Sequence, residues 1–240
     1  YRDSLGGDAG HACGHNLFGA ASVHAAVAIK EYLKETNQKG TIRLYGTPAE
    51  EGGSGKVYIA RDGYFDDVDI VLHWHPDDLN KSHFSSSNGN KSARFTFKGI
   101  SAHAAGAPQN GRSALDGVEA MNMMVNMMRE HMDEEARIHY VITKGGLAPN
   151  VVPEEAQVYY YVRHPKVNGV VELFERVVKA AEGAARGTET KLEYEVMHGN
   201  YPLMPNRVLS EMINTELLKL GGISYNDEEM AYAQELYKTL

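Results

Sequence analysis

The sequence predicts an α/β protein with two domains, in which a parallel or mixed sheet is interrupted by a smaller domain with its own sheet. Two observations support this prediction. Strand-like and helical segments alternate over residues 16–72, and the segments over residues 91–196 follow the order β-α-β-β-α-β. A chain of 240 residues can bury one large core or two. We expect residues 1–90 and 206–240 to form one domain and residues 91–205 to form the domain that interrupts it.

The first region is predicted to contain two helices and two strands. Alanine, valine, isoleucine and leucine dominate residues 16–36, which predicts a long buried helix with Asn16 as its N-cap. The short apolar runs at residues 41–46 and 68–72 predict strands, and Ser54 is placed to cap a short helix between them. Because strands and helices alternate, we expect parallel strands whose following loops build a site.

The second region carries six segments with the apolar period of a strand or a helix. In residues 91–99, Ala93, Phe95 and Phe97 alternate with polar neighbours, as in a strand with one solvated face. The other segments are a helix over residues 111–131, strands over 137–143 and 156–162, a helix over 167–186 and a strand over 188–196. This order is that of a ferredoxin-like split unit. Two more helices are predicted over residues 207–220 and 227–240.

Composition and charge exclude several classes of function. Hydrophobic residues at 42% and charged residues at 23% are ordinary for a globular protein. A net charge of −8 argues against a nucleic-acid partner, and no apolar run approaches the roughly 20 residues that cross a bilayer. A single cysteine cannot form an internal disulfide, which favours a reducing, cytoplasmic location. The chain begins at Tyr1 without an initiator methionine, so a preceding targeting segment stays open.

The single cysteine lies between two histidines in the segment His-Ala-Cys-Gly-His-Asn. Cys13 and His15 are two residues apart, so both side chains can project to one side of a turn and reach one metal pair. A thiolate is a soft ligand that suits zinc. A buried structural cysteine beside two solvent-facing histidines is an equally good interpretation of this segment alone.

Two further segments contribute candidate ligands. Glu50 and Glu51 are adjacent on a glycine-rich loop, where one carboxylate can bind an ion while the other accepts a proton from water. His73 and His75 flank a tryptophan at the end of a predicted strand, so they lie on one side of it. A solvated acidic turn is the alternative for the glutamates. Together the three segments indicate a divalent-metal hydrolase.

Five motifs occur in a fixed order: the Cys-Gly-His segment, Pro-Ala-Glu-Glu-Gly-Gly from Pro48, Leu-His-Trp-His-Pro from Leu72, Ser-Ala-His-Ala from Ser101 and Asn-Val-Val-Pro from Asn150. In this order they resemble the M20 family of metallopeptidases and amidohydrolases, and most closely its branch similar to the B subunit of p-aminobenzoyl-glutamate hydrolase. The resemblance implies a catalytic domain with a zinc-peptidase-like fold, interrupted by a lid domain that also dimerises. The predicted ferredoxin-like unit would form that lid.

The resemblance also implies a metal-dependent amidohydrolase that cleaves N-acyl or N-aroyl amino acids, such as p-aminobenzoyl-glutamate, or small peptides. Two divalent ions, Zn²⁺ or Mn²⁺, would be bound by Cys13, His15, Glu51 and His73. Glu50 would be the general base that activates water and then the acid that protonates the leaving amine. His75 would lie outside the ligand set.

Three lid residues complete the implied site. His103 would stabilise the oxyanion, in the active site of the partner subunit, and Asn150 and Arg163 would hold the substrate carboxylate. Without the resemblance, His103 is equally a surface histidine in a small-residue loop, and Arg163 is a solvated arginine at a strand end. We expect a homodimer through the lid, and a second, different subunit is a further candidate partner.

The predicted lid helix over residues 111–131 and its end are rich in methionine. Met121, Met123, Met124, Met127, Met128 and Met132 cover more than one face of a helix. We expect one stripe to pack on the lid sheet and another to meet the partner's lid. Alternatively, the methionines are flexible side chains that fill gaps in one large core.

Two features depart from the family pattern. Many relatives have aspartate at the position of Asn16, whereas asparagine is expected there in the p-aminobenzoyl-glutamate-like branch. The family's last histidine ligand has no counterpart before Leu240, and early strands are missing before Tyr1. We therefore expect a fragment of a longer protein, with the amidase activity belonging to the intact protein.

Two other classes of function stay open at this point. In one, Cys13 is the nucleophile of a thiol hydrolase and a histidine is its base. In the other, the chain is a non-catalytic binding or dimerisation module that retains an inactive site. Chelator sensitivity restored by metal separates the metal enzyme from the thiol hydrolase, whereas tight ligand binding without turnover, unaffected by Glu50→Gln, would support the non-catalytic module.

Overall fold

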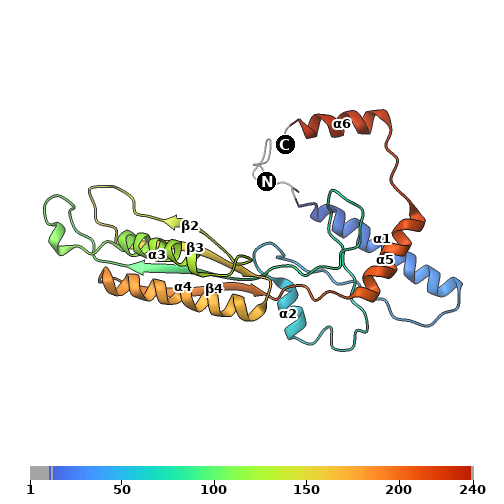
Figure 1. The fold of residues 1–240 in the computed structure, drawn as a ribbon, viewed down its shortest axis with the longest axis horizontal. Coiled ribbons are helices and arrows are strands. Elements are labelled where there is room, and N and C mark those ends of the chain that lie inside the picture. Colours follow the sequence, from blue (N-terminus) through green and yellow to red (C-terminus); the bar gives the residue numbers. More distant parts are fainter. Residues whose placement is uncertain (1–10, 12, 239–240) are drawn as a thin grey trace. The chain divides into compact units, whose positions relative to one another are not determined.

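The computed structural model describes His11 and residues 13–238, which divide into two compact units (Figure 1). Unit 1 comprises the residues up to Tyr45 with Ile70–Phe84 and Pro205–Leu240, and unit 2 comprises Gly46–Asp69 with Ser85–Met204. Unit 2 therefore includes the loop that holds the adjacent glutamates, which the sequence assigns to the first domain.

Unit 2 is built on a four-stranded antiparallel sheet with the strand order β2-β3-β1-β4. Its strands are β1 (Gly89–Lys98), β2 (Arg137–Lys144), β3 (Glu155–His164) and β4 (Lys191–Asn200). Helix α3 (Ala114–Met128) lies between β1 and β2 in the chain, and α4 (Val167–Gly187) lies between β3 and β4. The major elements of this unit thus follow the order β-α-β-β-α-β that the sequence predicts.

One face of the sheet is covered by α3 and α4 because alternate strand residues are apolar. The fully buried strand residues on this face include Ala93, Phe95, Phe97, Val158, Tyr160 and Val162. The Tyr160 hydroxyl donates to Asn122 Oδ1 of α3 at 2.5 Å, so its buried polar atom is satisfied. Gly117 lets α3 approach the sheet closely, since a Cβ there would overlap the Phe97 ring.

A capping residue and two short 3₁₀ turns mark the ends of α3, and a further short helix precedes the sheet. Ser113 caps α3 by accepting a hydrogen bond from the Asp116 amide, so the helix begins three residues after the predicted start. Two 3₁₀ turns, η1 (Pro108–Asn110) and η2 (Arg129–His131), flank α3. The short helix α2 (Gly55–Arg61) follows Ser54 as expected, but the Ser54 side chain makes no capping hydrogen bond.

Unit 1 consists of helices and irregular segments in the part that the structure describes. Its helices are α1 (His15–Glu35), α5 (Arg207–Leu220) and α6 (Asp227–Tyr237). Asn206 caps α5, and Asn226 with Glu229 forms a capping box at the start of α6. None of the helices among the described residues combines the length and the apolar character needed to cross a membrane.

Two predicted strands do not form. Residues 41–46 and 68–72 have no strand partner among the described residues, and Leu44, Val71 and Leu72 are 52%, 61% and 62% exposed. A strand needs a hydrogen-bonded neighbour, so apolar sequence alone does not create one. The prediction of a parallel sheet is therefore wrong for the described residues, whose sheet is antiparallel.

Two predicted boundaries are also wrong. Helix α1 begins at His15 with Gly14 in the left-handed conformation as its N-cap, so Asn16 lies inside the helix. The sequence predicts the last strand over 188–196, but β4 starts at Lys191, because the amides of Thr188 and Thr190 still bond to carbonyls of the last turn of α4.

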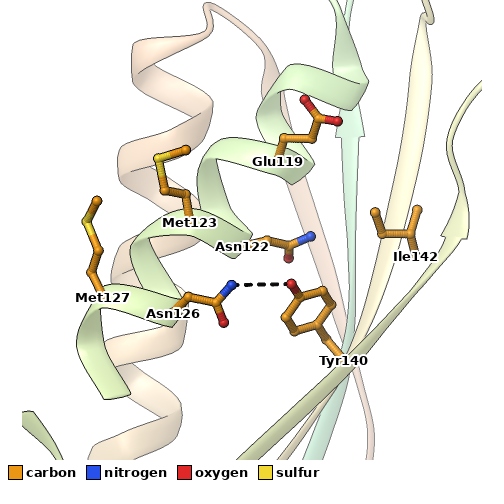
Figure 2. A pocket seen from close by; sticks show the side chains of 7 residues that line it. All are labelled: Glu119, Asn122, Met123, Asn126, Met127, Tyr140 and Ile142. Atoms are coloured by element: carbon orange, nitrogen blue, oxygen red, sulfur yellow. Dashed lines mark hydrogen bonds between the residues drawn. The ribbon is translucent and has the colours of Figure 1, made fainter. Parts of the chain in front are cut away.

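An open groove lies between α3 and the edge strand β2 (Figure 2). Met123 and Met127 line its helix side and are 62% and 65% exposed, whereas Met121 is fully buried against the sheet. Tyr140 lines the strand side and its hydroxyl accepts a hydrogen bond from the Asn126 side chain at 3.4 Å. The methionines of this helix therefore fall on two faces, one buried in the core and one on the groove.

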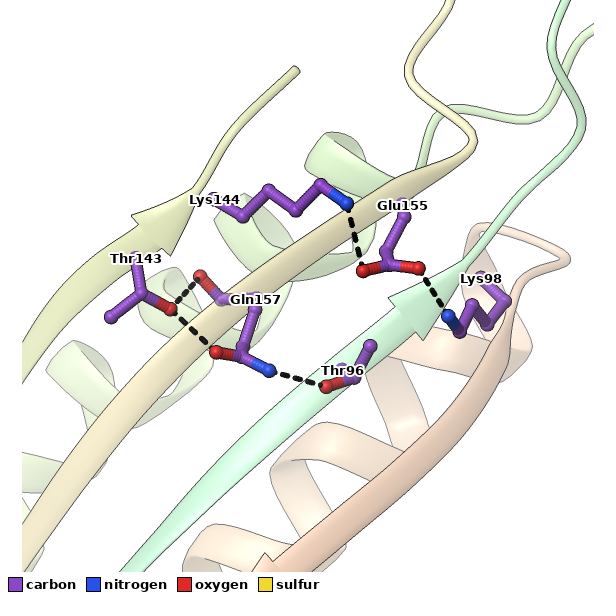
Figure 3. Close-up of polar contacts among 6 residues, drawn as sticks. All are labelled: Thr96, Lys98, Thr143, Lys144, Glu155 and Gln157. Atoms are coloured by element: carbon purple, nitrogen blue, oxygen red, sulfur yellow. Dashed lines mark hydrogen bonds and ion pairs between the residues drawn. The ribbon is translucent and has the colours of Figure 1, made fainter.

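The open face of the sheet carries a polar network across three strands (Figure 3). Glu155 of β3 pairs with Lys98 of β1 and, at 2.9 Å, with Lys144 of β2. Beside it, Gln157 links Thr96 to Thr143 through hydrogen bonds of 2.9 Å each. The two lysine partners lower the pKa of Glu155 from its ordinary 4.5 to about 2.

We expect Glu155→Gln to lower the thermal stability at neutral pH, because the carboxylate is stabilised in the folded state. Since the folded pKa lies below the ordinary value, this contribution is complete above about pH 4.5 and disappears as the pH falls towards 2. The melting temperatures of the two proteins, measured by circular dichroism across this range, should therefore converge in acid. A constant difference at every pH, or an equal effect of the exposed control Glu135→Gln, would contradict the role of the ion pairs.

Candidate functional site

The Cys-Gly-His segment forms the turn that leads into α1. Gly14 has φ 82°, a left-handed conformation that glycine adopts without strain. A Cβ on Gly14 would lie 2.8 Å from Pro76 Cγ, so the turn packs tightly on the segment that holds the two later histidines. Cys13 and His15 are both half-buried. A glycine is therefore needed between the two predicted ligands, because the backbone of Gly14 is left-handed and because a Cβ there would press against Pro76.

His75 is the histidine that contacts Cys13. Its Nε2 lies 3.3 Å from Cys13 Sγ, and its Nδ1 lies 2.7 Å from the Pro76 carbonyl oxygen. Because a carbonyl can only accept, Nδ1 carries a proton and donates it, which leaves Nε2 to face the thiol. The Phe18 ring lies 5.1 Å from the rings of both His15 and His75 and holds the histidine segment against α1.

His73 is exposed, and within the described residues it does not form a three-ligand group with Cys13 and His15. The metal-ligand role of His73 therefore stays a prediction. The family resemblance leaves His75 outside the ligand set, and the structure gives it a direct contact with Cys13, one of the predicted ligands. The alternation of a strand does not explain this, because residues 68–72 form no strand.

Glu50 and Glu51 lie on a tightly turned loop of unit 2. The Gly53 amide donates to the Ala49 carbonyl at 2.9 Å, and Ala49 and Ser54 both have positive φ angles, of 56° and 53°. A Cβ on Gly55 would overlap the Pro48 carbonyl oxygen. The glycines after the glutamates therefore allow the chain to double back and present both carboxylates at an exposed turn.

This loop lies at one end of the sheet of unit 2. Burial and a hydrogen bond with Tyr159 raise the pKa of Tyr161 to about 12, and the negative charge of Glu51 adds to the shift. Arg163, two residues along β3, places its guanidinium 5.5 Å from the centre of the Tyr161 ring. Glu51 and Arg163 therefore belong to the same end of the sheet.

His103 and Asn150 lie together at the opposite end. His103 forms an isolated bridge with Val151, and the Ala104 amide donates to the Asn150 carbonyl at 3.0 Å. His103 Nδ1 accepts hydrogen bonds from the amides of Ala105 and Gly106 at 3.2 and 2.9 Å. Nδ1 is thereby fixed as an acceptor, so Nε2 of the neutral ring carries a proton that it can donate outward.

The two ends are far apart in one chain. The loop with His103 and Asn150 precedes Glu155 at the start of β3, and Arg163 lies near the end of that strand. At roughly 3.3 Å per residue, β3 advances about 26 Å from Glu155 to Arg163. Unit 2 therefore does not bring His103 together with Arg163 or Glu51.

The predicted site residues are divided among three places. Cys13, His15 and His73 belong to unit 1, Glu50, Glu51 and Arg163 belong to one end of unit 2, and His103 and Asn150 belong to its other end. Two partners beside Arg163, Tyr161 and His198, are missed by reasoning from the sequence. Alternation along residues 156–162 assigns Tyr161 to the solvated face, but no sequence signal pairs it with a histidine of another strand.

Comparisons with known proteins identify the domain. Residues 85–189 match the family model "Peptidase dimerisation domain" of the M20 family. The chain contains an M20 peptidase dimerisation domain. It is 45% identical over 235 residues to the B subunit of p-aminobenzoyl-glutamate hydrolase from Escherichia coli, covering 98% of this chain and 49% of that protein. The M20 resemblance of the five motifs is thus confirmed.

Another curated protein and a solved structure are also similar to this chain. The chain is 30% identical over 215 residues to the Xaa-Arg dipeptidase of Mus musculus, covering 88% of this chain and 50% of that protein. A putative aminohydrolase from methicillin-resistant Staphylococcus aureus has a similar fold, with a TM-score of 0.54 at 15% identity, covering 72% of this chain and 46% of that one. The M20 chain spans about half the length of the curated relatives that it matches.

We expect Gly55→Ala to disturb the glutamate loop, because the added methyl group would overlap the Pro48 carbonyl oxygen. Overpacking of this kind costs about 1–3 kcal/mol of unfolding free energy, measured by chemical denaturation. Gly52→Ala is the matched control, since nothing lies within 4 Å of a Cβ there. Equal stability of the two variants would show that the loop is not held as tightly as its contacts indicate.

Proposed function

We propose that this chain supplies the metal-binding and lid segments of an M20 amidohydrolase that cleaves N-acyl or N-aroyl amino acids. The observation that supports this most strongly is the 45% identity to the B subunit of p-aminobenzoyl-glutamate hydrolase over 98% of the chain. The similarity extends over the region of all five motifs of the candidate site. A compound of the p-aminobenzoyl-glutamate type is the substrate that we propose.

We propose that the lid is the sheet of unit 2 with its two helices, in ferredoxin-like arrangement. It would be inserted at residues 91–205 into a catalytic domain formed by residues 1–90 and 206–240. The antiparallel strand order β2-β3-β1-β4 supports this division, as does the match of residues 85–189 to a dimerisation domain.

The donor set fits a pair of divalent ions. Cys13 offers a thiolate, His15 an imidazole and Glu51 a carboxylate, with His73 as the fourth proposed ligand, and thiolate with imidazole favours zinc while carboxylates also accept manganese. Bound ions would polarise the substrate carbonyl and make a water molecule more acidic. The contact of Cys13 with His75 Nε2 supports a thiolate, because a neighbouring imidazole can accept the thiol proton.

The remaining groups have roles that follow from their chemistry. Glu50, next to the ligand Glu51 on the same exposed turn, would accept a proton from the attacking water and pass it to the leaving amine. His103 would donate from Nε2 to the developing oxyanion, a role for which its Nδ1 contacts leave the right nitrogen protonated. Arg163 and Asn150 would bind the substrate carboxylate.

The length of β3 supports the proposal that His103 acts in the site of a partner subunit. About 26 Å of strand separates the end that holds His103 from the end that holds Arg163. A side chain does not bridge that distance within one lid. In a homodimer, the far end of one lid would reach the site of the other copy.

The groove between α3 and β2 is the surface that we propose for this dimer. β2 is an edge strand of the described sheet, so one side of it has no neighbouring strand there, and Val141 and Ile142 on it are 56% and 42% exposed. Met123 and Met127 add exposed apolar area on the helix side. A second copy could pair with the strand edge and cover both methionines.

The first experiment measures metal in the purified 240-residue chain by elemental analysis after loading with Zn²⁺ or Mn²⁺. We expect bound metal that a chelator removes, with less metal in Cys13→Ser and Glu51→Gln and unchanged metal in Glu50→Gln. In a longer form of the protein, Glu50→Gln should slow p-aminobenzoyl-glutamate hydrolysis by about 10²–10⁴-fold. A chain that never binds divalent metal, or normal turnover by Glu50→Gln, would refute the proposal.

A thiol hydrolase is the second candidate, because Cys13 Sγ lies 3.3 Å from His75 Nε2 as a nucleophile and base would. Iodoacetamide should then abolish activity that a chelator leaves intact. The metal proposal predicts the opposite result: a chelator should abolish the activity, and added metal should restore it.

We expect Met127→Glu to shift the protein from dimer to monomer, because a charge on the groove would be desolvated at the dimer interface. Light scattering coupled to size exclusion, over a range of protein concentrations, measures the change. Val171→Glu on α4, also exposed at 43% but outside the groove, is the control and should stay dimeric. A wild-type monomer at every concentration would exclude the homodimer and make a different subunit the candidate occupant.

A further inference from the structure

The imidazole of His75 contacts the thiol of Cys13 in unit 1. His75 Nε2 lies 3.3 Å from Cys13 Sγ, although the two residues are 62 positions apart in the chain. The centroid of the Phe18 ring lies 5.1 Å from that of the His75 ring, and a Cβ on Gly14 would lie 2.8 Å from Pro76 Cγ. Helix α1 and the turn before it therefore fix the position of this imidazole. All five residues belong to unit 1, so the contact does not depend on unit 2.

The orientation of the His75 ring gives it the arrangement of a metal ligand. Its Nδ1 lies 2.7 Å from the Pro76 carbonyl oxygen, which can only accept, so Nδ1 of the neutral ring carries the proton. Nε2 then has a free lone pair, and it is the nitrogen that faces Cys13. Histidines that bind a metal almost always donate from their other ring nitrogen, often to a backbone carbonyl. The hydrogen bond to Pro76 is therefore the support that a metal-binding histidine needs.

The distance between the two atoms is close to the distance between two ligands of one zinc ion. Zinc binds sulfur at about 2.3 Å and imidazole nitrogen at about 2.0–2.1 Å, so a tetrahedral angle separates the two ligand atoms by about 3.6 Å. The observed 3.3 Å between Cys13 Sγ and His75 Nε2 therefore needs only a small outward movement of one side chain. An ion between them would replace the thiol proton, which is released to solvent.

His15 and His75 would bind different ions. A ligand atom of His15 lies within 4.8 Å of Cys13 Sγ, but among the described residues the ligand atoms of Cys13, His15 and His75 do not all lie within 4.8 Å of one another. Cys13 is thus near both imidazoles, while the imidazoles are farther from each other. The ions of two-metal sites are about 3.5–4 Å apart, which allows one imidazole on each ion.

We propose that His75 binds a divalent ion through Nε2, as a ligand additional to the four of the proposed function. The inference rests on that function and extends it, because the family resemblance assigns the ligand of this segment to His73 and leaves His75 outside the set. A further imidazole also bears on the identity of the metal. Nitrogen and sulfur donors favour Zn²⁺, whereas Mn²⁺ prefers oxygen donors, so His75 should shift the selectivity of the site towards zinc.

Nuclear magnetic resonance of the ¹⁵N-labelled 240-residue chain, loaded with ¹¹³Cd²⁺ in place of zinc, tests the proposal without an activity assay. We expect a scalar coupling between ¹¹³Cd and Nε2 of His75, because such a coupling requires a coordinate bond. His15 should couple to the other cadmium ion. A loaded chain in which His15 is coupled to cadmium and His75 is not would overturn the inference and leave the proposed function standing. A chain that binds no divalent ion would overturn both.

Zinc affinity, measured by competition with a chromophoric chelator, is the second readout. Residues that only orient a ligand typically contribute about 10–100-fold to metal affinity, so His75→Ala should weaken the binding of one zinc ion by about 100-fold or more. His83→Ala is the matched control, because His83 is an exposed histidine of unit 1 whose Nε2 lies 3.7 Å from Asp77. It should bind zinc as the wild type does.

Unchanged zinc affinity in His75→Ala, or an equal loss in His83→Ala, would overturn the inference. The melting temperatures of the metal-free variants, measured by circular dichroism, show whether each variant is folded. If His75→Ala does not fold, the cadmium coupling in the wild type decides the question by itself.

Discussion

The rigidity of the central strand β3 constrains the candidate site more than any other feature. This strand is hydrogen-bonded to β1 on one side and β2 on the other, and Val158, Tyr160 and Val162 are fully buried under the helices. It cannot bend without breaking both ladders and exposing this core. The polar groups at its two ends therefore stay about 26 Å apart. Chemistry that needs both ends must draw on two copies of the sheet.

Local contacts decide which nitrogen each of two histidines offers. His75 donates from Nδ1 to a carbonyl, whereas His103 accepts at Nδ1 from two amides. In the neutral ring the remaining nitrogen is thereby an acceptor on His75 and a donor on His103. Two residues of one type thus become suited to different partners, His75 to a thiol or metal and His103 to an oxyanion.

The sequence predicts unit 2 well because its signals are local. Alternation in β1 identifies Phe95 and Phe97 as core residues, and the order of the elements follows from periodicity. The first region is predicted poorly, because the apolar runs at 41–46 and 68–72 depend on strand partners that no local signal supplies. The helix start is missed for a similar reason: Asn16 has the right side chain for a cap, but the left-handed Gly14 provides the turn.

The candidate site is predictable in its ligand types but not in its contacts. The order of the motifs predicts Cys13 and His15 as metal ligands. The contact between Cys13 and His75, which is 62 residues away in the chain, is visible only in the folded structure. In the proposed function, a bound ion would also stabilise the folded protein, because a metal that binds only the folded state shifts the unfolding equilibrium towards that state.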